Sequence, residues 1–471
     1  MTWETVIGLE VHVQLATASK LFCGCPTTFG NPPNSNVCPV CLGLPGALPM
    51  PNEAALRLAT RAAVALGCTV HHRSVFARKN YFYPDLPKGY QISQFDRPLA
   101  TGGRVTCESP ERGTIAVPVA RLHVEEDAGK SLHDRFPNAT AIDFNRAGVP
   151  LAEIVTGPDL RSPGEARAYL TALKQILIYA GVSECNMEQG SLRVDANISL
   201  RRSGAALGTK TEVKNMNSFA NVERAIEAEQ DRQRGILETG GAIEQVTLLF
   251  NPGAGSVKPM RSKEESHDYR YFPDPDLPPV VVTAEWIDRE RVALPELPDA
   301  KRQRFTASFG LSSYDARVLA ADRDIGNYFD AVVRAGAEPK AAANWVMGEI
   351  LARFNETGVL AVPAATLGAL IGMVQSGAVS HTAGKTILGA IAGSDETPAT
   401  AAERLGLLQV RDDAALEAWV DQVLAASPNE VARCRGGEMK LIGFLVGQVM
   451  KLSRGQADPK VIGQLIERKI G

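Results

Sequence analysis

The sequence lacks any long apolar run. No stretch of about 18 or more consecutive apolar residues occurs, and a helix that crosses a membrane needs about that many. Residues 1–5, MTWET, contain neither the basic segment nor the apolar segment of a secretory signal peptide. The sequence therefore predicts a cytoplasmic protein without a membrane partner.

The motifs of three common enzyme classes are also missing. The chain has no G-x-x-x-x-G-K-[ST] loop, which excludes a P-loop nucleotide site. No G-x-G-x-x-G opens a helix after an expected strand, so a dinucleotide-binding fingerprint is absent. No nucleophile elbow occurs either, because Gly190-Ser191 precedes a strand rather than a sharp strand-to-helix turn.

The chain also has little net charge. Its 471 residues suggest about two to four domains. They are 45% hydrophobic and 22% charged, as in ordinary globular proteins, and the formal net charge is −3. Because no global positive field attracts nucleic acid, any RNA contact must come from local patches. One such patch is the segment 434–471, where seven Lys and Arg exceed three Asp and Glu by four.

The pattern of apolar residues predicts an α+β chain with three domains. We expect a largely antiparallel sheet domain over residues 1–292, an all-α domain over 293–404 and a small all-α tail over 405–471. The expected strands are 5–15, 115–127, 140–145, 192–201, 208–216 and 244–250. The expected helices that we delimit are 51–66, 162–180, 221–234, 414–426, 440–453 and 459–470.

Four of the eight cysteines form a cluster in the sequence. Cys23, Cys25, Cys38 and Cys41 have the spacing C-x-C-x12-C-x2-C, and two close pairs of thiolates suit tetrahedral zinc. Four sulfur ligands leave no open position, so we expect a structural site, a zinc knuckle. The alternative is four buried free cysteines. Such clustering fits metal binding in a reducing cytoplasm better than a disulfide framework.

Polar side chains share one face of several expected strands. In residues 7–15, IGLEVHVQL, the apolar side chains occupy one face, and Glu10 and His12 lie on the other. The same alternation recurs at 119–127, 192–200 and 209–214. A solvated sheet face is the simpler interpretation. Two histidines with several carboxylates, arginine and asparagine favour a functional face.

Such a face suits a divalent cation and phosphate. Magnesium prefers oxygen ligands and usually keeps waters and bound phosphate. Glu10 and Glu125 are the first candidate ligands, with His12 or Asp195 as a further one. Lys and Arg side chains nearby would then contact phosphate oxygens.

Two segments, 78–90 and 261–278, interleave basic and aromatic residues. They read RKNYFYPDLPKGY and RSKEESHDYRYFPDPDLP. Such loops can stack a nucleobase or the 3′ end of an RNA and neutralise phosphate. They can equally be proline-stiffened loops whose aromatic rings pack on the sheet, and both interpretations stay open.

Several long motifs, in the same order along the chain, resemble one family. They are IGLEVHVQL with KLFCGC, NVCPVCLGLPGALP, RKNYFYPDLPKGYQISQ, HVEEDAGK, DFNRAGVPLAEIVTGPD, MEQGSLRVDANISLR, TKTEVKNMNSF, SHDYRYFPDPDLPP and, in the tail, GFLVGQVMKLSRGQADPK. Over its whole length the chain resembles the B subunit of the aspartyl/glutamyl-tRNA(Asn/Gln) amidotransferases, the GatB/GatE family.

The resemblance implies an ATP-dependent carbon–nitrogen ligase with glutamine as amido donor. The family phosphorylates the side-chain carboxylate of mischarged Glu-tRNA(Gln) or Asp-tRNA(Asn) and amidates it to Gln-tRNA(Gln) or Asn-tRNA(Asn). An amidase, the A subunit, releases ammonia, which an internal channel delivers, and a small C subunit completes a heterotrimer. ATP, Mg²⁺ and structural Zn²⁺ are the implied cofactors. The N-terminal domain, called the cradle, would hold the kinase and transamidase site, and the other two domains would grip the tRNA.

The resemblance also implies roles for individual residues. Glu10, His12 and Glu125 match the motifs in which the family holds a metal, and we expect them to be catalytic. Because imidazole is an unusual magnesium ligand, His12 can instead bind ADP, orient Glu10 or favour manganese. Lys79 and Lys88 match the basic aromatic motif, near the channel mouth or the substrate. The residues that match motifs around the nucleotide and the aminoacyl end are Arg193, Asp195, Asn197, Lys210, Lys214 and Asn215.

Two other functions stay open at this point. A non-catalytic tRNA-binding scaffold would also lack a glutaminase signature, but it has no need of clustered Glu10, His12 and Glu125. A stand-alone structural zinc protein would bind no nucleotide and would lose its fold with its zinc. The charged sheet face therefore favours the enzyme.

Overall fold

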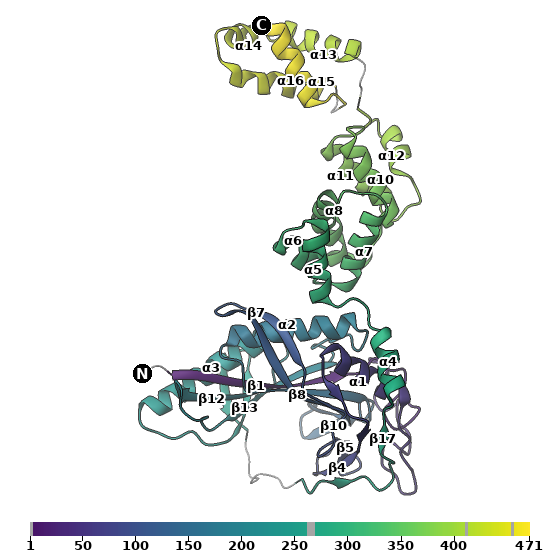
Figure 1. Ribbon diagram of the computed structural model, residues 1–471, viewed down its shortest axis with the longest axis vertical. Coiled ribbons are helices and arrows are strands. Elements are labelled where there is room, and N and C mark those ends of the chain that lie inside the picture. Colours follow the sequence, from purple (N-terminus) through teal and green to yellow (C-terminus); the bar gives the residue numbers. More distant parts are fainter. Residues whose placement is uncertain (1–2, 261–268, 410–412, 454–455) are drawn as a thin grey trace. The chain divides into compact units, whose positions relative to one another are not determined.

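The computed structural model describes residues 3–260, 269–409, 413–453 and 456–471 (Figure 1). The chain divides into two compact units, Met1–Leu297 and Pro298–Gly471. The first unit combines sheets with helices, and the second unit is built of helices. The mixed α+β class predicted from the sequence is therefore confirmed.

A sheet of ten described strands forms the body of the first unit. β1 (Trp3–Gln14) lies inside this sheet, between β11 (Pro150–Thr156) and β12 (Leu192–Arg202), and pairs antiparallel with both. On the β12 side follow β13 (Thr211–Lys214), β14 (Thr247–Asn251) and β15 (Ser256–Pro259). On the β11 side follow β8 (Gly113–Glu126), β6 (Ala100–Thr101) and β2 (Thr69–Val70), while β7 (Arg104–Ser109) pairs with β8. Among the described strands of this sheet, β13 and β14 make the one parallel pair.

The two faces of this sheet differ in polarity. The apolar side chains of β1 between Ile7 and Val13 are almost completely buried, and the polar ones alternate with them. Helices α1 (Glu53–Ala65), α2 (Pro163–Tyr179) and α3 (Phe219–Glu238) bury apolar side chains in the same core cluster. Removal of this apolar surface from water is the main stabilising contribution to the fold. It leaves the polar face of the sheet available for chemistry.

Capping residues fix where two of these helices begin. Ser162, the N-cap of α2, accepts a hydrogen bond from the backbone N–H of Glu165, and Pro163 stands in the first turn. The Asn52 side chain caps α1 by accepting hydrogen bonds from two backbone N–H groups. Both helices were expected, α1 from the spacing of its apolar residues and α2 from Pro163 at its start and Gly181 just past its end.

Shorter elements lie beside the large sheet. β4 (Ala77–Asn80) pairs with β5 (Tyr90–Ser93) and β16 (Phe272–Pro273), β9 (Lys130–Phe136) pairs with β10 (Ala139–Asp143), and β3 (Arg73–Ser74) pairs with β17 (Val280–Val281). Helix α4 (Ala284–Val292) follows β17. In Figure 1, β4, β5 and β10 lie on the other side of the large sheet from α2. These small strands therefore stand over the polar face.

The six expected strands are present, with ends shifted by at most three residues. β11 was not expected. Its sequence, PLAEIVT, is almost wholly apolar, because the strand is buried on both faces along nearly its whole length. Alternation of polar and apolar residues, which marked the other strands, therefore does not reveal it.

The second unit contains two hydrophobic cores. The first core extends from Phe305 to Ala402 and the second from Leu416 to Ile470. The helices around the first core are α5 (Pro298–Phe309), α6 (Ser313–Leu319), α7 (Arg323–Arg334), α8 (Pro339–Trp345), the π-helical turn Val346–Ile350, α9 (Leu351–Thr357), α10 (Ala364–Gln375), α11 (His381–Ile391) and α12 (Pro398–Arg404). Those around the second are α13 (Asp413–Ala426), α14 (Pro428–Arg435), the 3-10 turn Met439–Leu441, α15 (Ile442–Leu452) and α16 (Pro459–Ile470). None of the described helices combines the length and the apolar character needed to cross a membrane.

Candidate active site and metal centre

Four neighbouring strands bring charged side chains into one row on the polar face. His12 of β1 lies opposite Glu153 of β11 and opposite Arg193 of β12, and Glu153 lies opposite His123 of β8. Side chains at directly opposed positions of an antiparallel pair lie on the same face, about 5 Å apart at Cβ. The register therefore produces the row His123, Glu153, His12 and Arg193.

Two carboxylates and two imidazoles meet in a buried group, here called the acidic cluster: His12, His123, Glu125 and Glu153. Glu153 Oε2 lies 3.4 Å from His12 Nε2 and 3.1 Å from His123 Nε2. The Glu125 carboxylate oxygens lie 3.5 Å from His12 Nε2 and 3.6 Å from His123 Nε2, and one accepts a hydrogen bond from the Ser93 hydroxyl. Glu125 is 3% exposed and Glu153 8%. Buried carboxylates are costly unless paired, and the two imidazoles provide that pairing.

Attraction within the acidic cluster outweighs the effect of burial on its charges. Burial alone would lower the pKa of His123, but hydrogen bonding and charge from Glu125 and Glu153 raise this pKa to about 9. Burial also opposes the charge of His12, and the same carboxylates again raise the pKa. In turn, the imidazoles overcome burial and lower the pKa values of Glu125 and Glu153. Without a bound cation, the acidic cluster therefore favours protonated imidazoles paired with ionised carboxylates.

Three members of the acidic cluster can hold a metal ion together. One ligand atom each from His12, Glu125 and Glu153 lies within 4.8 Å of the others. Two carboxylates and one imidazole form a ligand set for a hard or borderline divalent cation. The imidazole makes manganese as suitable as magnesium.

Glu10 lies on the same face but outside this three-residue group. Its carboxylate accepts a hydrogen bond from Asn197 Nδ2 at 3.0 Å. Burial, followed by the charge of Glu153, raises the pKa of Glu10. Of the three expected magnesium ligands, the structure thus brings His12 and Glu125 together with Glu153 and places Glu10 beside them.

Two of the expected substrate residues form ion pairs near the acidic cluster. Arg193 contacts Asp127 at 2.9 Å, and Lys214 contacts Asp195 at 2.6 Å. Burial disfavours the ammonium of Lys214, but Asp195 and Glu212 outweigh it and raise the pKa. Both cationic side chains are therefore charged and positioned on the sheet.

A cavity of about 730 Å³ opens beside these ion pairs. Arg193, Asp195 and Asn215 line it, together with Arg135 and Arg146. Asn215 directly follows β13 and has a left-handed backbone with φ of 70°, a conformation that asparagine tolerates better than most residues. The volume lies in the range of small-molecule and cofactor sites.

The other three expected residues lie elsewhere. Lys79 of β4 has Nζ 4.8 Å from the ring centre of Tyr269, a cation–π distance. Lys88 pairs with the buried carboxylate of Glu126 and lines a smaller cavity next to the cysteines. Lys210 is exposed in the loop between β12 and β13. The structure therefore brings neither Lys88 nor Lys210 into contact with the acidic cluster.

Aromatic residues of the two basic segments pack against one another. Tyr269 makes edge contacts with Tyr81 and Tyr271, at ring-centre distances of 5.8 Å and 6.0 Å, and Tyr271 stacks on Phe95 at 4.1 Å. Burial and then the negative charge of Glu125 raise the pKa of Tyr81 and of Tyr271, which places both rings near the acidic cluster. These rings therefore pack against one another, and both packing on the sheet and RNA stacking stay hypotheses. Residues 261–268 of the second segment lie outside the described part of the chain.

The sequence did not reveal Glu153 as a site residue, and it gave no role to His123. The available signal for Glu153 was one carboxylate in the otherwise apolar run PLAEIVT, since charged side chains are rarely buried without a partner. His123 was visible on the polar face, but its contact with two carboxylates depends on β11. The unexpected strand thus accounts for both omissions.

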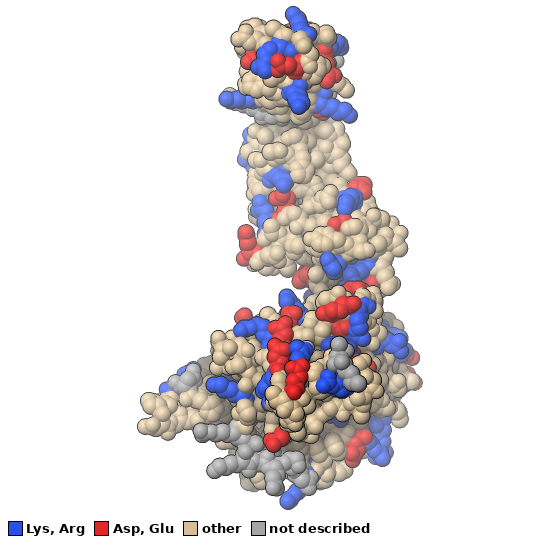
Figure 2. Space-filling model, turned by 90° about the vertical axis from the view of Figure 1, so that its left-hand side faces the viewer, with Lys and Arg blue, Asp and Glu red and all other residues tan. Residues whose placement is uncertain are grey.

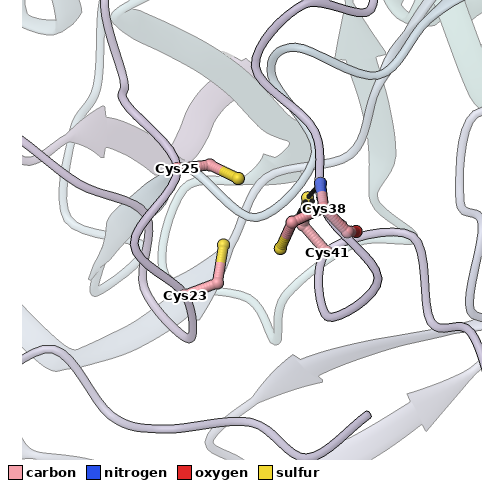
Figure 3. A group of neighbouring side chains, drawn as sticks. All are labelled: Cys23, Cys25, Cys38 and Cys41. Atoms are coloured by element: carbon pink, nitrogen blue, oxygen red, sulfur yellow. Dashed lines mark hydrogen bonds between the residues drawn. The ribbon is translucent and has the colours of Figure 1, made fainter.

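The four cysteines of the knuckle converge on one point (Figure 3). Their Sγ atoms lie within 4.8 Å of one another, and those of Cys38 and Cys41 are 3.9 Å apart. Four thiolates about 2.3 Å from a tetrahedral metal would lie ~3.8 Å from each other. All four are free thiols, and Cys41 Sγ accepts the backbone N–H of Cys38 at 3.2 Å. The donor set and its spacing are compatible with a structural metal.

The fold and these two clusters define an α+β unit with two candidate metal sites, followed by a helical unit. Two family models match the chain: the GatB/GatE catalytic domain over residues 5–288 and the GatB domain over residues 327–470. The chain is 52% identical to a protein of Anaeromyxobacter sp. (strain K), 50% to one of Solidesulfovibrio magneticus and 48% to one of Geobacter sulfurreducens. Each comparison covers 100% of this chain and at least 99% of the relative, and each relative is named as the B subunit of an aspartyl/glutamyl-tRNA(Asn/Gln) amidotransferase. The chain belongs to the GatB/GatE family.

Proposed function

We propose that the chain is the B subunit of a tRNA-dependent amidotransferase. Its full-length relatives at 48–52% identity carry that name. The substrates are Glu-tRNA(Gln) or Asp-tRNA(Asn), and the complex acts as an ATP-dependent carbon–nitrogen ligase. An amidase, the A subunit, supplies ammonia from glutamine, a small C subunit completes the heterotrimer, and the cytoplasm is its location.

Two chemical steps convert the substrate carboxylate to an amide. A side-chain carboxylate oxygen of the aminoacyl group attacks the γ-phosphorus of ATP, the bond from phosphorus to the ADP oxygen breaks, and an acyl phosphate forms. Ammonia then attacks the acyl carbon, a proton is lost, and inorganic phosphate leaves. Phosphoryl transfer of this kind depends mainly on positioning and on neutralisation of charge.

The acidic cluster is the observation that carries this proposal. Glu125, Glu153 and His12 would hold a magnesium or manganese ion, which when bound supplies charge neutralisation for the phosphates. The three side chains come from three adjacent strands, so the sheet fixes their mutual positions. Their burial also limits access of water, which would hydrolyse an acyl phosphate before ammonia arrives.

We place the nucleotide and the aminoacyl end in the neighbouring 730 Å³ cavity. Arg193 and Lys214 would contact phosphate oxygens, because both are cationic and lie at or beside its wall. Asp127 and Asp195, their present partners, keep the two charges in place before the substrate enters. Asn197 and Glu10 lie next to this region and would contact the substrate.

The remaining parts of the chain have supporting roles in this proposal. Residues 1–292 hold the catalytic cradle, and residues 293–404 and 405–471 bind the tRNA. The four cysteines hold a structural zinc ion. Figure 2 shows acidic and basic side chains interspersed on the visible surfaces of the first unit and of the tail, so tRNA would bind through local groups of cations rather than one uniformly positive face.

The test measures activation in the absence of ammonia. The reconstituted complex receives Glu-tRNA(Gln), magnesium and γ-labelled ATP, and phosphate release is followed for wild type, Glu125→Gln and Glu108→Gln. Glu108 is an exposed glutamate of β7 and serves as the matched control. We expect tRNA-dependent release by wild type and by Glu108→Gln, and loss of that release in Glu125→Gln.

Equal release by all three proteins would favour the second candidate function, a non-catalytic tRNA-binding scaffold. That function is consistent with the basic excess of segment 434–471. It gives no reason for two carboxylates and two imidazoles to be buried together, because exposed cations alone suffice to bind RNA phosphates.

A further inference from the structure

Lys20 is a completely buried lysine, with 0% exposure. Its ammonium group donates to the backbone carbonyl of Asn36 at 2.7 Å, to the carbonyl of Phe144 at 3.4 Å and to Cys41 Sγ at 3.6 Å. An ammonium group has three donors and no acceptor, so these three partners use its full capacity. All donors of the buried Lys20 ammonium group are therefore satisfied by the protein.

Within the described part of the chain Lys20 forms no direct ion pair with a carboxylate, and Glu126, which lines the same cavity, pairs with Lys88 instead. A buried cation without a counter-ion destabilises the folded protein, because the charge has lost its hydration. The atom in contact with Lys20 that can carry negative charge is Cys41 Sγ.

The cysteine cluster would supply this negative charge once it holds a divalent metal. Four thiolates around one doubly charged cation carry a net charge of about −2. Cys41 is the buried member of the four, so water screens its charge least. Lys20 then offsets one of these two negative charges inside the protein.

The contacts of Lys20 also connect the knuckle to the rest of the cradle. Asn36 belongs to the turn between the two cysteine pairs, and Phe144 follows β10. Gly148, with φ of 86°, lies beside them, since a Cβ atom at this position would be in van der Waals contact with Cys41 Cβ at 3.4 Å, Lys20 Cδ at 3.5 Å and Glu126 Oε2 at 3.9 Å.

We propose that Lys20 is the buried counter-ion of the metal-bound cysteine cluster and a positioning residue for Cys41. This inference rests on the zinc binding that forms part of the proposed function. The three contacts of its ammonium group connect the second cysteine pair, the knuckle turn and the segment after β10. Partners that contact and orient a metal ligand typically contribute about 10- to 100-fold in metal affinity.

The test compares zinc affinity of the full-length chain with that of Lys20→Met, by competition with a chromophoric chelator. Methionine has a similar length and no charge. Lys301→Met is the control, because Lys301 is also buried, at 3% exposure, but pairs with Asp330 in the second unit. We expect the zinc dissociation constant to rise about 10- to 100-fold in Lys20→Met and to stay unchanged in Lys301→Met.

A second readout separates this role from a merely structural one. With cobalt(II) in place of zinc, loss of a cation beside a thiolate raises the energy of the sulfur electrons, so the sulfur-to-cobalt charge-transfer band should move to longer wavelength in Lys20→Met. If Lys20→Met does not fold, Lys20→Gln is measured instead, since it keeps amide donors without the charge.

The outcomes are distinct. A wild-type chain that binds no zinc overturns the metal assignment itself. Tight zinc binding by wild type with the same affinity and the same cobalt spectrum in the Lys20 variant overturns the counter-ion role alone. A weaker affinity together with the shifted band supports it.

Discussion

Glu153 of β11 and His12 of β1 face each other across an antiparallel pair, and their Oε2 and Nε2 atoms lie 3.4 Å apart. Strand register alone produces this contact between residues that lie far apart in the cradle sequence. A slip of one residue between the two strands would turn every side chain of one strand to the opposite face. The buried apolar face fixes the register, and with it the proposed cation site.

The first prediction concerns Glu153 itself. Glu153→Gln should lower tRNA-dependent phosphate release by at least about 10²-fold, because it removes one of two anionic ligands from the proposed cation. It should also weaken manganese binding, measured by the decrease of the free-ion EPR signal during titration.

Glu212→Gln is the matched control for manganese binding. Glu212 lies on β13 and points to the same face as Asn197, which is its direct partner, but it contacts Lys214 rather than the acidic cluster. Its substitution should leave manganese affinity within error of wild type. Equal affinities for wild type, Glu153→Gln and Glu212→Gln would contradict the assignment of Glu153 as a ligand.

Much of the sheet and part of the site could be predicted from the sequence. β1, β8 and β12 each have one apolar and one polar face, so alternation identified both the strands and the side chains that face away from the core. His12 and Glu125 were identified for this reason. The two residues meet only because β1 and β8 belong to the same sheet in a particular register. Alternation indicates which face each side chain occupies, but it does not determine which strands are neighbours or how they are aligned.

The rest depends on long-range packing. β11 is buried on both of its faces, so its sequence resembles a core segment and hides Glu153. The contact of Lys88 was also hidden in the sequence. A basic residue in an aromatic loop suggested a contact with the substrate. In the structure its partner is Glu126, the residue next to Glu125 but on the other face of β8. Alternation places these two neighbouring glutamates on opposite faces, but nothing local in the sequence shows that Lys88 pairs with Glu126.

The second prediction is a pH dependence of cation binding. His123 has a pKa of about 9 and the pKa of His12 is raised from 6.5, because Glu125 and Glu153 hold protons on both rings. A cation that takes over these carboxylates must release such protons. Manganese affinity should therefore rise with pH between about 6.5 and 9. Isothermal titration in buffers of different ionisation enthalpy measures the released protons, and an affinity that rises on acidification would refute the scheme.

The third prediction concerns the cysteines. The purified chain should contain about one zinc ion by mass spectrometry, since four thiolates complete one tetrahedral site. Cys38→Ser should lose this zinc and unfold at a lower temperature, because metal binding is coupled to folding of the knuckle. Cys68→Ser changes a half-buried cysteine outside the cluster and should retain the metal. Loss of zinc from both variants, or from neither, would count against the assignment.

The fourth prediction places tRNA binding in the tail. A chain that ends at Gln409 keeps Leu407, which packs on the first helical core, and lacks the whole second core from Leu416 to Ile470. Because the segment 434–471 has four more basic than acidic residues, its removal should weaken tRNA binding by the complex. The dependence of log affinity on log salt should become shallower by roughly one unit for each phosphate that the tail no longer neutralises.

Fluorescence anisotropy with labelled tRNA at several salt concentrations measures both the affinity and its salt dependence. Glutamine hydrolysis by the complex is the control and should not change, because the truncation leaves the cradle residues 1–292 intact. An unchanged affinity with an unchanged salt dependence would show that the basic residues of the tail form only a solvated surface. A weaker affinity with an unchanged salt dependence would instead assign the tail an uncharged role in binding, since released counterions, and not shape, determine that slope.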